Sequence, residues 1–163
     1  MSLLDIDLGI LDVLELVEFN KSPLTDIKKF SKQCDIGIIE GGVANSENFE
    51  VLREFRKKCD IIVALGECSI WGGMPAMRNT MPLKECLDEA YLHSISSENG
   101  ANVIPNHEDI PKLLDKVYSI HDIIKVDYYI PGCPPNAEHI WKMVKNILFG
   151  TKEKVEYSNF KYD

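Results

Sequence analysis

Two of the five cysteines stand in turns that suit a metal–sulfur site. Cys68 follows Gly66-Glu67, and Cys133 follows Pro131-Gly132. An iron–sulfur cluster is held by cysteine thiolates, normally four, and the backbone comes close enough to offer N–H donors to its sulfides. Glycine just before the ligand permits that approach, and the prolines after Cys133 fix the turn. Buried thiols in tight turns have the same residue pattern, so chemistry alone leaves both interpretations open.

The remaining cysteines and the histidines give no comparable pattern. Cys34 and Cys59 stand just before expected strands and Cys86 lies in an expected helix, so all three are interpreted as structural thiols. An odd number of cysteines argues against a disulfide framework. The four histidines are scattered, and the sequence has no Walker A motif, no dinucleotide fingerprint and no Ser-His-Asp arrangement.

Alternating apolar runs and amphipathic segments must position the two cysteine turns. This alternation predicts an α/β fold, a parallel sheet with helices on both faces, and such sheets form sites at the carboxyl ends of their strands. Three expected strands end in glycine-containing turns at 40–42, 66–68 and 131–133, which places Cys68 and Cys133 along one edge of the sheet. The patterns predict strands at 16–19, 36–39, 61–65 and 126–130, helices at 3–17, 24–32, 47–58, 83–93, 110–117 and 137–148, and an irregular segment at 69–80.

Composition limits the class of protein. The 163 residues are 45% hydrophobic and 27% charged, which is typical of one globular domain. The formal net charge of −8 argues against nucleic acid or an anionic membrane as the partner. The longest apolar run, Ile61 to Leu65, is too short to span a bilayer, and no basic, apolar leader follows Met1, so a cytoplasmic location is expected.

The two cysteine turns, taken with their flanks, resemble a known family. Gly66-Glu67-Cys68-Ser69 after a buried strand, followed by the VDYYIPGCPP segment at 126–135, resembles the family shared by hydrogenase small subunits and the 20 kDa-type subunit of respiratory complex I. Complex I relatives carry a glycine- and tyrosine-rich stretch where WGGMPAMRN stands at 71–79. That segment, LTDIK at 24–28, EGGV at 40–43 and the closing Tyr162-Asp163 resemble the small subunit of soluble, NAD-linked, bidirectional nickel–iron hydrogenases.

This resemblance implies a flavodoxin-like, doubly wound sheet that holds one 4Fe–4S cluster, with Cys68 and Cys133 matching two of the family's four cluster ligands. It implies an electron-transfer subunit that is not catalytic by itself. Its partners would be a NiFe large subunit, which splits or forms hydrogen, and diaphorase subunits that contain flavin and iron–sulfur clusters. Residues expected around the cluster or at a subunit contact are Glu40, Gly66, Trp71, Gly132 and Pro134.

The chain departs from the family at its start. The family's other two ligands come from a Cys-x-x-Cys motif just before a segment like Ser2 to Asp7, and this sequence begins at Met1. A flavodoxin-like sheet also has a central first strand, in the order 2-1-3-4-5, and none precedes the expected helix at Leu3. We therefore expect about 20 or more upstream residues with a strand and Cys-x-x-Cys, and expect the 163-residue chain alone to be insoluble or molten.

Two other functions stay open on the sequence. One is a relay subunit of a complex I-like or formate hydrogenlyase assembly, which would be distinguished by its large subunit. The other is a flavodoxin-like scaffold module without a cluster, which would contain no iron.

Overall fold

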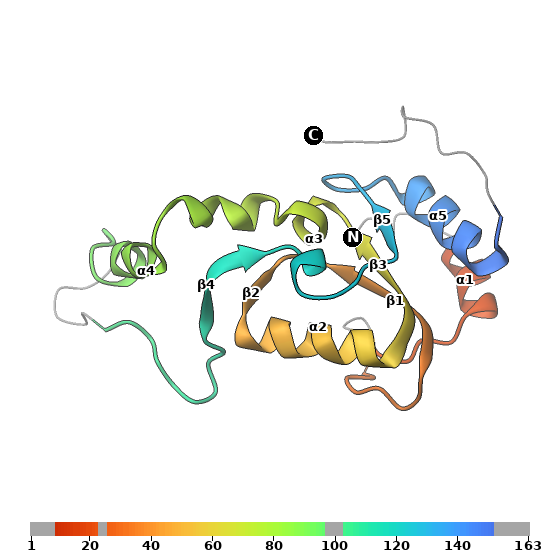
Figure 1. The fold of residues 1–163 in the computed structure, drawn as a ribbon, viewed down its shortest axis with the longest axis horizontal. Helices are drawn as coiled ribbons and strands as arrows, with labels where there is room; N and C mark the ends of the chain where they lie inside the picture. Colours follow the sequence, from red (N-terminus) through yellow and green to blue (C-terminus); the bar gives the residue numbers. More distant parts are fainter. Residues whose placement is uncertain (1–8, 23–25, 97–102, 152–163) are drawn as a thin grey trace.

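A computed structural model describes residues 9–22, 26–96 and 103–151, and Figure 1 shows their arrangement. The helices are α1 (Gly9–Leu16), α2 (Ser46–Lys58), α3 (Glu67–Trp71), α4 (Leu83–Tyr91) and α5 (Ala137–Phe149), with 3-10 helices η2 (Met74–Thr80) and η3 (Ile120–Asp122). The strands are β1 (Cys34–Glu40), β2 (Val43–Asn45), β3 (Cys59–Leu65), β4 (Leu113–Tyr118) and β5 (Tyr128–Ile130).

Three parallel strands form the main sheet in the order β1-β3-β5. In this register Glu40 lies opposite Leu65, and Leu65 lies opposite Ile130, so the three carboxyl ends form one row. The middle of β3 is an unbroken apolar run whose residues 62–64 are fully buried, as expected for a strand covered on both faces. The aligned ends mean that the three following turns start from the same edge of the sheet.

Helices cover both faces of this sheet and build a core on each. On one face Ile62 and Ala64 pack in a cluster with Leu52 of α2. On the other, Val63 and Ile130 pack with Ile140 of α5. Because side chains alternate along β3, the single strand supplies both cores. The predicted doubly wound α/β fold with a parallel sheet is confirmed (Figure 1).

The helix expected at 110–117 is wrong: residues 110–112 are irregular and Leu113–Tyr118 form strand β4. β4 pairs antiparallel with β2, with Val43 opposite Tyr118. The Asn79 side chain donates to the Val117 carbonyl and accepts from the Val117 N–H, both at 2.8 Å. A helix this short is marginal by itself, and these long-range bonds to the backbone favour the extended form.

The N-terminal predictions also need correction. Leu16 closes α1 and residues 17–19 lie in no strand, so the strand expected at 16–19 is absent. Residues 26–32 are irregular rather than helical, while positions 3–8, 24 and 25 of the predicted helices lie outside the described residues. The buried side chain of Asn20 donates to the Lys32 carbonyl and accepts from the Ser31 N–H, which holds this segment as a closed loop.

The segment expected to be irregular at 69–80 has local order. It includes most of α3 and then η2, separated by Gly72 and Gly73, whose φ angles are +86° and +52°. Figure 1 shows η2 and α4 running away from the main sheet toward the far end of the molecule. None of the residues of η2 or α4 is buried.

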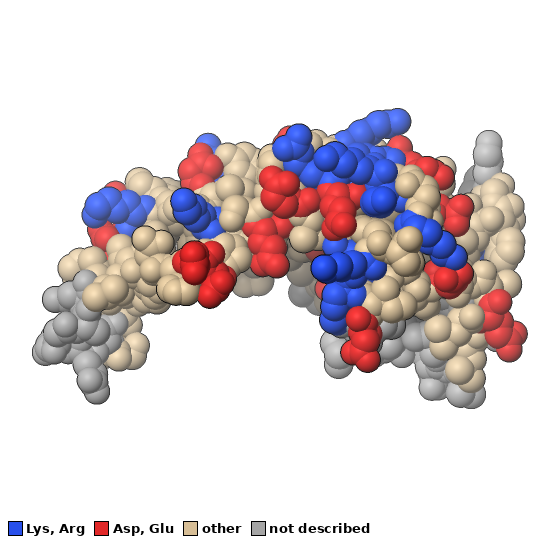
Figure 2. Space-filling model, turned by 90° about the horizontal axis from the view of Figure 1, so that it is seen from below, with Lys and Arg blue, Asp and Glu red and all other residues tan. Residues whose placement is uncertain are grey.

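The side of the molecule that carries α2 has charges of both signs. Figure 2 shows Lys and Arg side chains lying beside Asp and Glu side chains on this face. Some of them pair directly: Lys21 Nζ lies 2.6 Å from Glu54 Oε2. This face is therefore a mixed charged surface rather than a field of one sign.

An ion-pair network joins α2 to the start of β3 and the entry to β5. Arg56 Nη1 lies 2.7 Å from Asp127 Oδ2, and the same carboxylate oxygen accepts from the Ile62 N–H at 2.9 Å. Arg56 Nη2 donates to the carbonyls of Cys59 and Asp60. Burial opposes ionisation of Asp127, but the Ile62 N–H and the Arg56 guanidinium outweigh it and hold the pKa of this carboxyl below its usual range.

Asp127→Asn is expected to destabilise the fold by about 1–3 kcal/mol at pH 7, because it weakens charge-assisted hydrogen bonds in a partly buried site. Because the pKa of Asp127 is lower in the folded state than in the unfolded state, this group contributes its full stability above its unfolded pKa of about 3.9. That contribution is lost as the pH falls through the pKa of Asp127 in the folded protein. The measurement is the urea midpoint of the purified native protein, in its full-length form, between pH 7 and pH 3. The difference between wild type and variant should shrink below about pH 4, and a difference independent of pH would contradict the prediction. The exposed Asp26→Asn is the control.

Candidate metal centre

The turns that carry Cys68 and Cys133 are hydrogen-bonded to each other. The Gly66 N–H donates to the Ile130 carbonyl at 2.8 Å, which continues the pairing of β3 with β5. One residue later the Glu67 N–H donates to the Gly132 carbonyl at 3.1 Å. The Gly132 N–H in turn donates to Glu67 Oε1 at 3.2 Å. The structure thus brings the two predicted cysteine turns together at the carboxyl edge of the sheet.

The third turn, at 40–42, packs against the first. A Cβ added to Gly42 would lie 3.3 Å from the Cys68 carbonyl oxygen and 2.9 Å from Val117 Cγ1. Glu40 is exposed at the end of β1, in the same row as Leu65. All three glycine turns predicted from the sequence therefore meet at one edge.

Cys68 lies in α3, directly after the end of β3. The buried Ser69 fixes this junction, because its hydroxyl donates to the carbonyls of Leu65 and Gly66 at 2.8 Å. The Cys68 thiol is partly buried. Gly73 lies so close that an added Cβ would be 2.8 Å from Cys68 Sγ. The backbone at Gly73 therefore lies close to the Cys68 side chain, a contact that the Gly-Glu-Cys motif does not indicate.

Cys133 is exposed and is joined to Pro134 by a cis peptide bond. Pro134 is also exposed, whereas Pro135 is buried. Gly132 has a φ of +140°, and an added Cβ would lie 2.5 Å from Pro135 Cα. Pro135 therefore packs against this turn, while Pro134, expected near the cluster or at a subunit contact, is on the surface.

Aromatic and methionine side chains cover the surface beside these turns. Trp71, 70% exposed, meets the His121 ring edge-on with centroids 6.0 Å apart, and His121 meets Tyr129 in the same way at 6.2 Å. Met74 and Met77 of η2 are also strongly exposed. Arg78 turns inward and donates to the carbonyls of Leu114 and Asp115 on β4. The arginine positions η2, while Trp71 and the methionines remain on the surface.

Cys34, Cys59 and Cys86 lie in other surroundings. Cys34 and Cys59 face each other at the opposite, amino ends of β1 and β3. Burial, together with the neighbouring Cys34, raises the pKa of the Cys59 thiol to about 11, so it stays protonated at neutral pH. Cys86 is on α4.

The donor set at the edge fits part of an iron–sulfur site. Two thiols stand on adjoining turns, and the close approach at Gly73 and Gly132 is what a ligand loop requires. In the part of the chain that the structure describes, no three His, Cys, Asp or Glu side chains gather as a metal-binding group. Among the described residues, two thiols and not four therefore stand on these adjoining turns.

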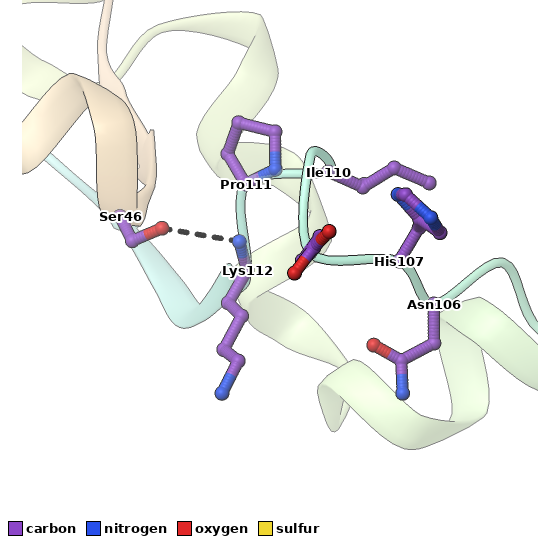
Figure 3. A pocket seen from close by; sticks show the side chains of 7 residues that line it. Ser46, Asn106, His107, Ile110, Pro111 and Lys112 are labelled. Atoms are coloured by element: carbon purple, nitrogen blue, oxygen red, sulfur yellow. Dashed lines mark hydrogen bonds between the residues drawn. The ribbon is translucent and has the colours of Figure 1, made fainter.

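A shallow pocket elsewhere does not coincide with this edge. Figure 3 shows it between the start of α2 and the segment before β4, where the Lys112 N–H donates to Ser46 Oγ at 3.1 Å. None of its lining residues belongs to the cysteine turns; they are Ser46, Asn106, His107, Glu108, Ile110, Pro111 and Lys112.

Sequence reasoning misses two residues at the edge. Glu67 stands in the sequence only as part of a motif, although its side chain bonds the opposite turn. His121 is one of the scattered histidines, yet it lies between Trp71 and Tyr129. An acidic residue between the glycine and the cysteine is a visible signal for Glu67, but its partner depends on the register of β5. No sequence signal points to His121.

Comparison with known proteins identifies the relatives of this chain. The family model described as "NADH ubiquinone oxidoreductase, 20 Kd subunit" matches residues 1–147. The NAD-reducing hydrogenase HoxS subunit delta of Cupriavidus necator is 46% identical over 164 residues, covering 100% of this chain and 78% of that protein. The iron-sulfur subunit of the F420-non-reducing hydrogenase of Archaeoglobus profundus is 36% identical, and the match covers 92% of this chain and 52% of that protein.

A solved structure of a hydrogenase is also similar to this chain. The structure titled as NAD+-reducing [NiFe]-hydrogenase in the H2-reduced state contains a chain that is 44% identical and matches with a TM-score of 0.94, covering 100% of this chain and 90% of that one. Among the described residues, no helix is long and apolar enough to cross a membrane. The chain thus belongs to the NADH ubiquinone oxidoreductase 20 Kd subunit family, in which its relatives are hydrogenase subunits.

Proposed function

We propose that this chain is the electron-transfer small subunit of a cytoplasmic, NAD-linked nickel–iron hydrogenase. It would relay electrons between the NiFe site of the large subunit and the flavin- and iron–sulfur-containing diaphorase subunits. The observation that carries the proposal is the arrangement at the carboxyl edge of the sheet, where the strand ends Glu40, Leu65 and Ile130 lie in one row. The turns that follow Leu65 and Ile130 are hydrogen-bonded to each other and carry Cys68 and Cys133. Its support from similarity is the 0.94 TM-score with a chain of an NAD+-reducing hydrogenase.

Cys68 and Cys133 would hold two irons of one 4Fe–4S cluster, proximal to the NiFe site. When bound, such a cluster accepts and gives up single electrons. Residues of this chain would position the two ligands. Gly66 and Gly132 would let the backbone approach the cluster, and the Glu67 side chain hydrogen-bonds the Cys133 turn to the Cys68 turn. Pro134 and Glu40, both exposed, would lie near the cluster or at a subunit contact.

The exposed side chains of Trp71, Met74 and Met77 would contact the large subunit. An exposed tryptophan beside methionines is the composition that contact cores favour. Because Trp71 stands three positions after Cys68, this contact would bring the cluster edge close to the partner. If Trp71 stays solvent-exposed in the assembled complex, this assignment is wrong.

The test is purification of the intact complex under anaerobic conditions, with iron and sulfide analysis and the EPR spectrum of the reduced protein. A complete cluster assigned to this subunit, together with H2-dependent NAD+ reduction, is the expected result. A complex without iron in this subunit would instead identify a scaffold module. A large subunit without a nickel–iron site would identify a complex I-like relay.

Gly73→Ala is expected to weaken the cluster site. The new methyl group would lie 2.8 Å from Cys68 Sγ and 3.0 Å from Cys68 Cα, so the ligand must move. Changes beside ligands of a metal typically cost about 10- to 100-fold in metal affinity. The measurement is iron retained per complex after a timed chelator challenge.

Gly150→Ala is the matched control for this change. Gly150 also has a positive φ, of +64°, but no atom lies within 4 Å of its added Cβ. Both variants place alanine at a positive φ, but Gly150 is in the left-handed helical region (ψ +20°) whereas Gly73 is not (ψ −146°), and only Gly73→Ala meets Cys68. Equal iron loss in the two variants would contradict the proposed contact.

A further inference from the structure

The pairing of β3 with β5 should continue one step beyond the strands. In a parallel pair, every second residue of one strand bonds the same neighbouring strand with both its N–H and its C=O, and these two bonds reach residues two positions apart on the partner. Since Gly66 donates to the Ile130 carbonyl, the next bond in that ladder would run from the Gly132 N–H to the Gly66 carbonyl. Gly132 is buried, so its N–H needs an acceptor from the protein.

The Gly66 carbonyl is already committed to α3. It accepts from the Ser69 N–H at 3.2 Å, the Ile70 N–H at 3.3 Å and the Ser69 hydroxyl at 2.8 Å. The chain turns into a helix at this residue, so the ladder loses its acceptor where the second cysteine turn needs one. The Glu67 side chain fills this position, with Oε1 3.2 Å from the Gly132 nitrogen.

We infer that Glu67 is a positioning residue for the cluster: its carboxylate replaces the missing ladder carbonyl and sets the Cys133 turn against the Cys68 turn. The inference rests on the proposed cluster site. Glu67 has two bonds to Gly132, one from its backbone N–H and one to its side chain, and Gly132 is the residue directly before Cys133. Removing the side chain leaves a buried N–H without its acceptor, immediately before a ligand.

The experiment compares Glu67→Ala, Glu67→Gln and wild type in the intact hydrogenase complex. A glutamine side chain keeps an oxygen acceptor, so Glu67→Gln should behave like wild type if hydrogen bonding is the role. Three readouts are used: amide hydrogen exchange of the 128–136 peptide, iron retained under a chelator challenge, and the EPR spectrum of the reduced cluster. Glu50→Ala, an exposed change in the middle of α2, is the control for loss of a surface carboxylate.

In Glu67→Ala we expect faster exchange in the 128–136 peptide, iron loss about 10- to 100-fold faster and an altered cluster spectrum. Glu67→Gln should restore all three toward wild type. Wild-type exchange in Glu67→Ala would overturn the inference, as would fast exchange with unchanged iron retention and spectrum. Equal damage in Glu67→Gln would also overturn it. A wild-type complex without iron here would overturn the proposed function and this inference with it, before any variant is compared.

Discussion

Cys68→Ala or Cys133→Ala is expected to remove the cluster or convert it to a smaller species, and to stop electron flow out of the large subunit. Each change deletes one of the two thiols that the described residues bring together at this edge, and the other three cysteines lie elsewhere in the fold. An iron–sulfur cluster normally needs four thiolates. The measurements are the EPR spectrum of the reduced complex and the rate of H2-dependent NAD+ reduction.

The chain supplies its own controls for this result. Cys34→Ala, Cys59→Ala and Cys86→Ala should leave the cluster signal intact. Cys59 is the stringent control, because it is 2% exposed and its loss opens a small gap in the core. That variant should lose some thermal stability and keep its spectrum. An unchanged reduced-cluster spectrum in Cys133→Ala would sink the ligand assignment.

Gly132→Ala is expected to be the most damaging single methyl group that can be added to the edge. The new Cβ would lie 2.5 Å from Pro135 Cα and 2.8 Å from Pro135 N, which are backbone atoms that cannot rotate away. Overpacking typically costs about 1–3 kcal/mol, and holding a non-glycine residue in an unfavourable φ costs about 1–3 kcal/mol more. We expect a large drop in the urea midpoint, together with loss of iron.

Gly41→Ala separates the two parts of that effect. Gly41 stands in the corresponding turn after β1, with a φ of +83°, and nothing lies within 4 Å of its added Cβ. This variant should show only the cost of backbone strain. If Gly41→Ala and Gly132→Ala lower the urea midpoint equally, contact with Pro135 is not the cause of the damage.

The parts of the fold that could be predicted are those that local pattern determines. Residues 61–65 of β3 are a continuous apolar run, and α2 and α5 have amphipathic patterns with asparagine at the N-cap, so the sequence predicts all three at nearly the correct bounds. The rule that parallel sheets form sites at strand ends then brings Cys68 and Cys133 to one edge without any knowledge of the register.

The parts that failed depend on distant partners. β4 is extended because β2 and the Asn79 amide bond its backbone, and neither is visible from residues 110–117 alone. The loop before β1 is closed by Asn20, which acts on residues eleven and twelve positions away. Glu67 escapes prediction for the same reason, since its role arises only after α3 has taken the Gly66 carbonyl.

The adjacency of the two cysteine turns has a consequence for how the protein is made. Cys68 and Cys133 are 65 residues apart in the sequence, and they meet only when β5 pairs with β3. At about 5–20 residues per second, a ribosome needs about 3–13 seconds to pass from one codon to the other. Throughout that interval the nascent chain offers one thiol of the pair. Completion of the proposed cluster at this edge must therefore follow translation of the β5 turn.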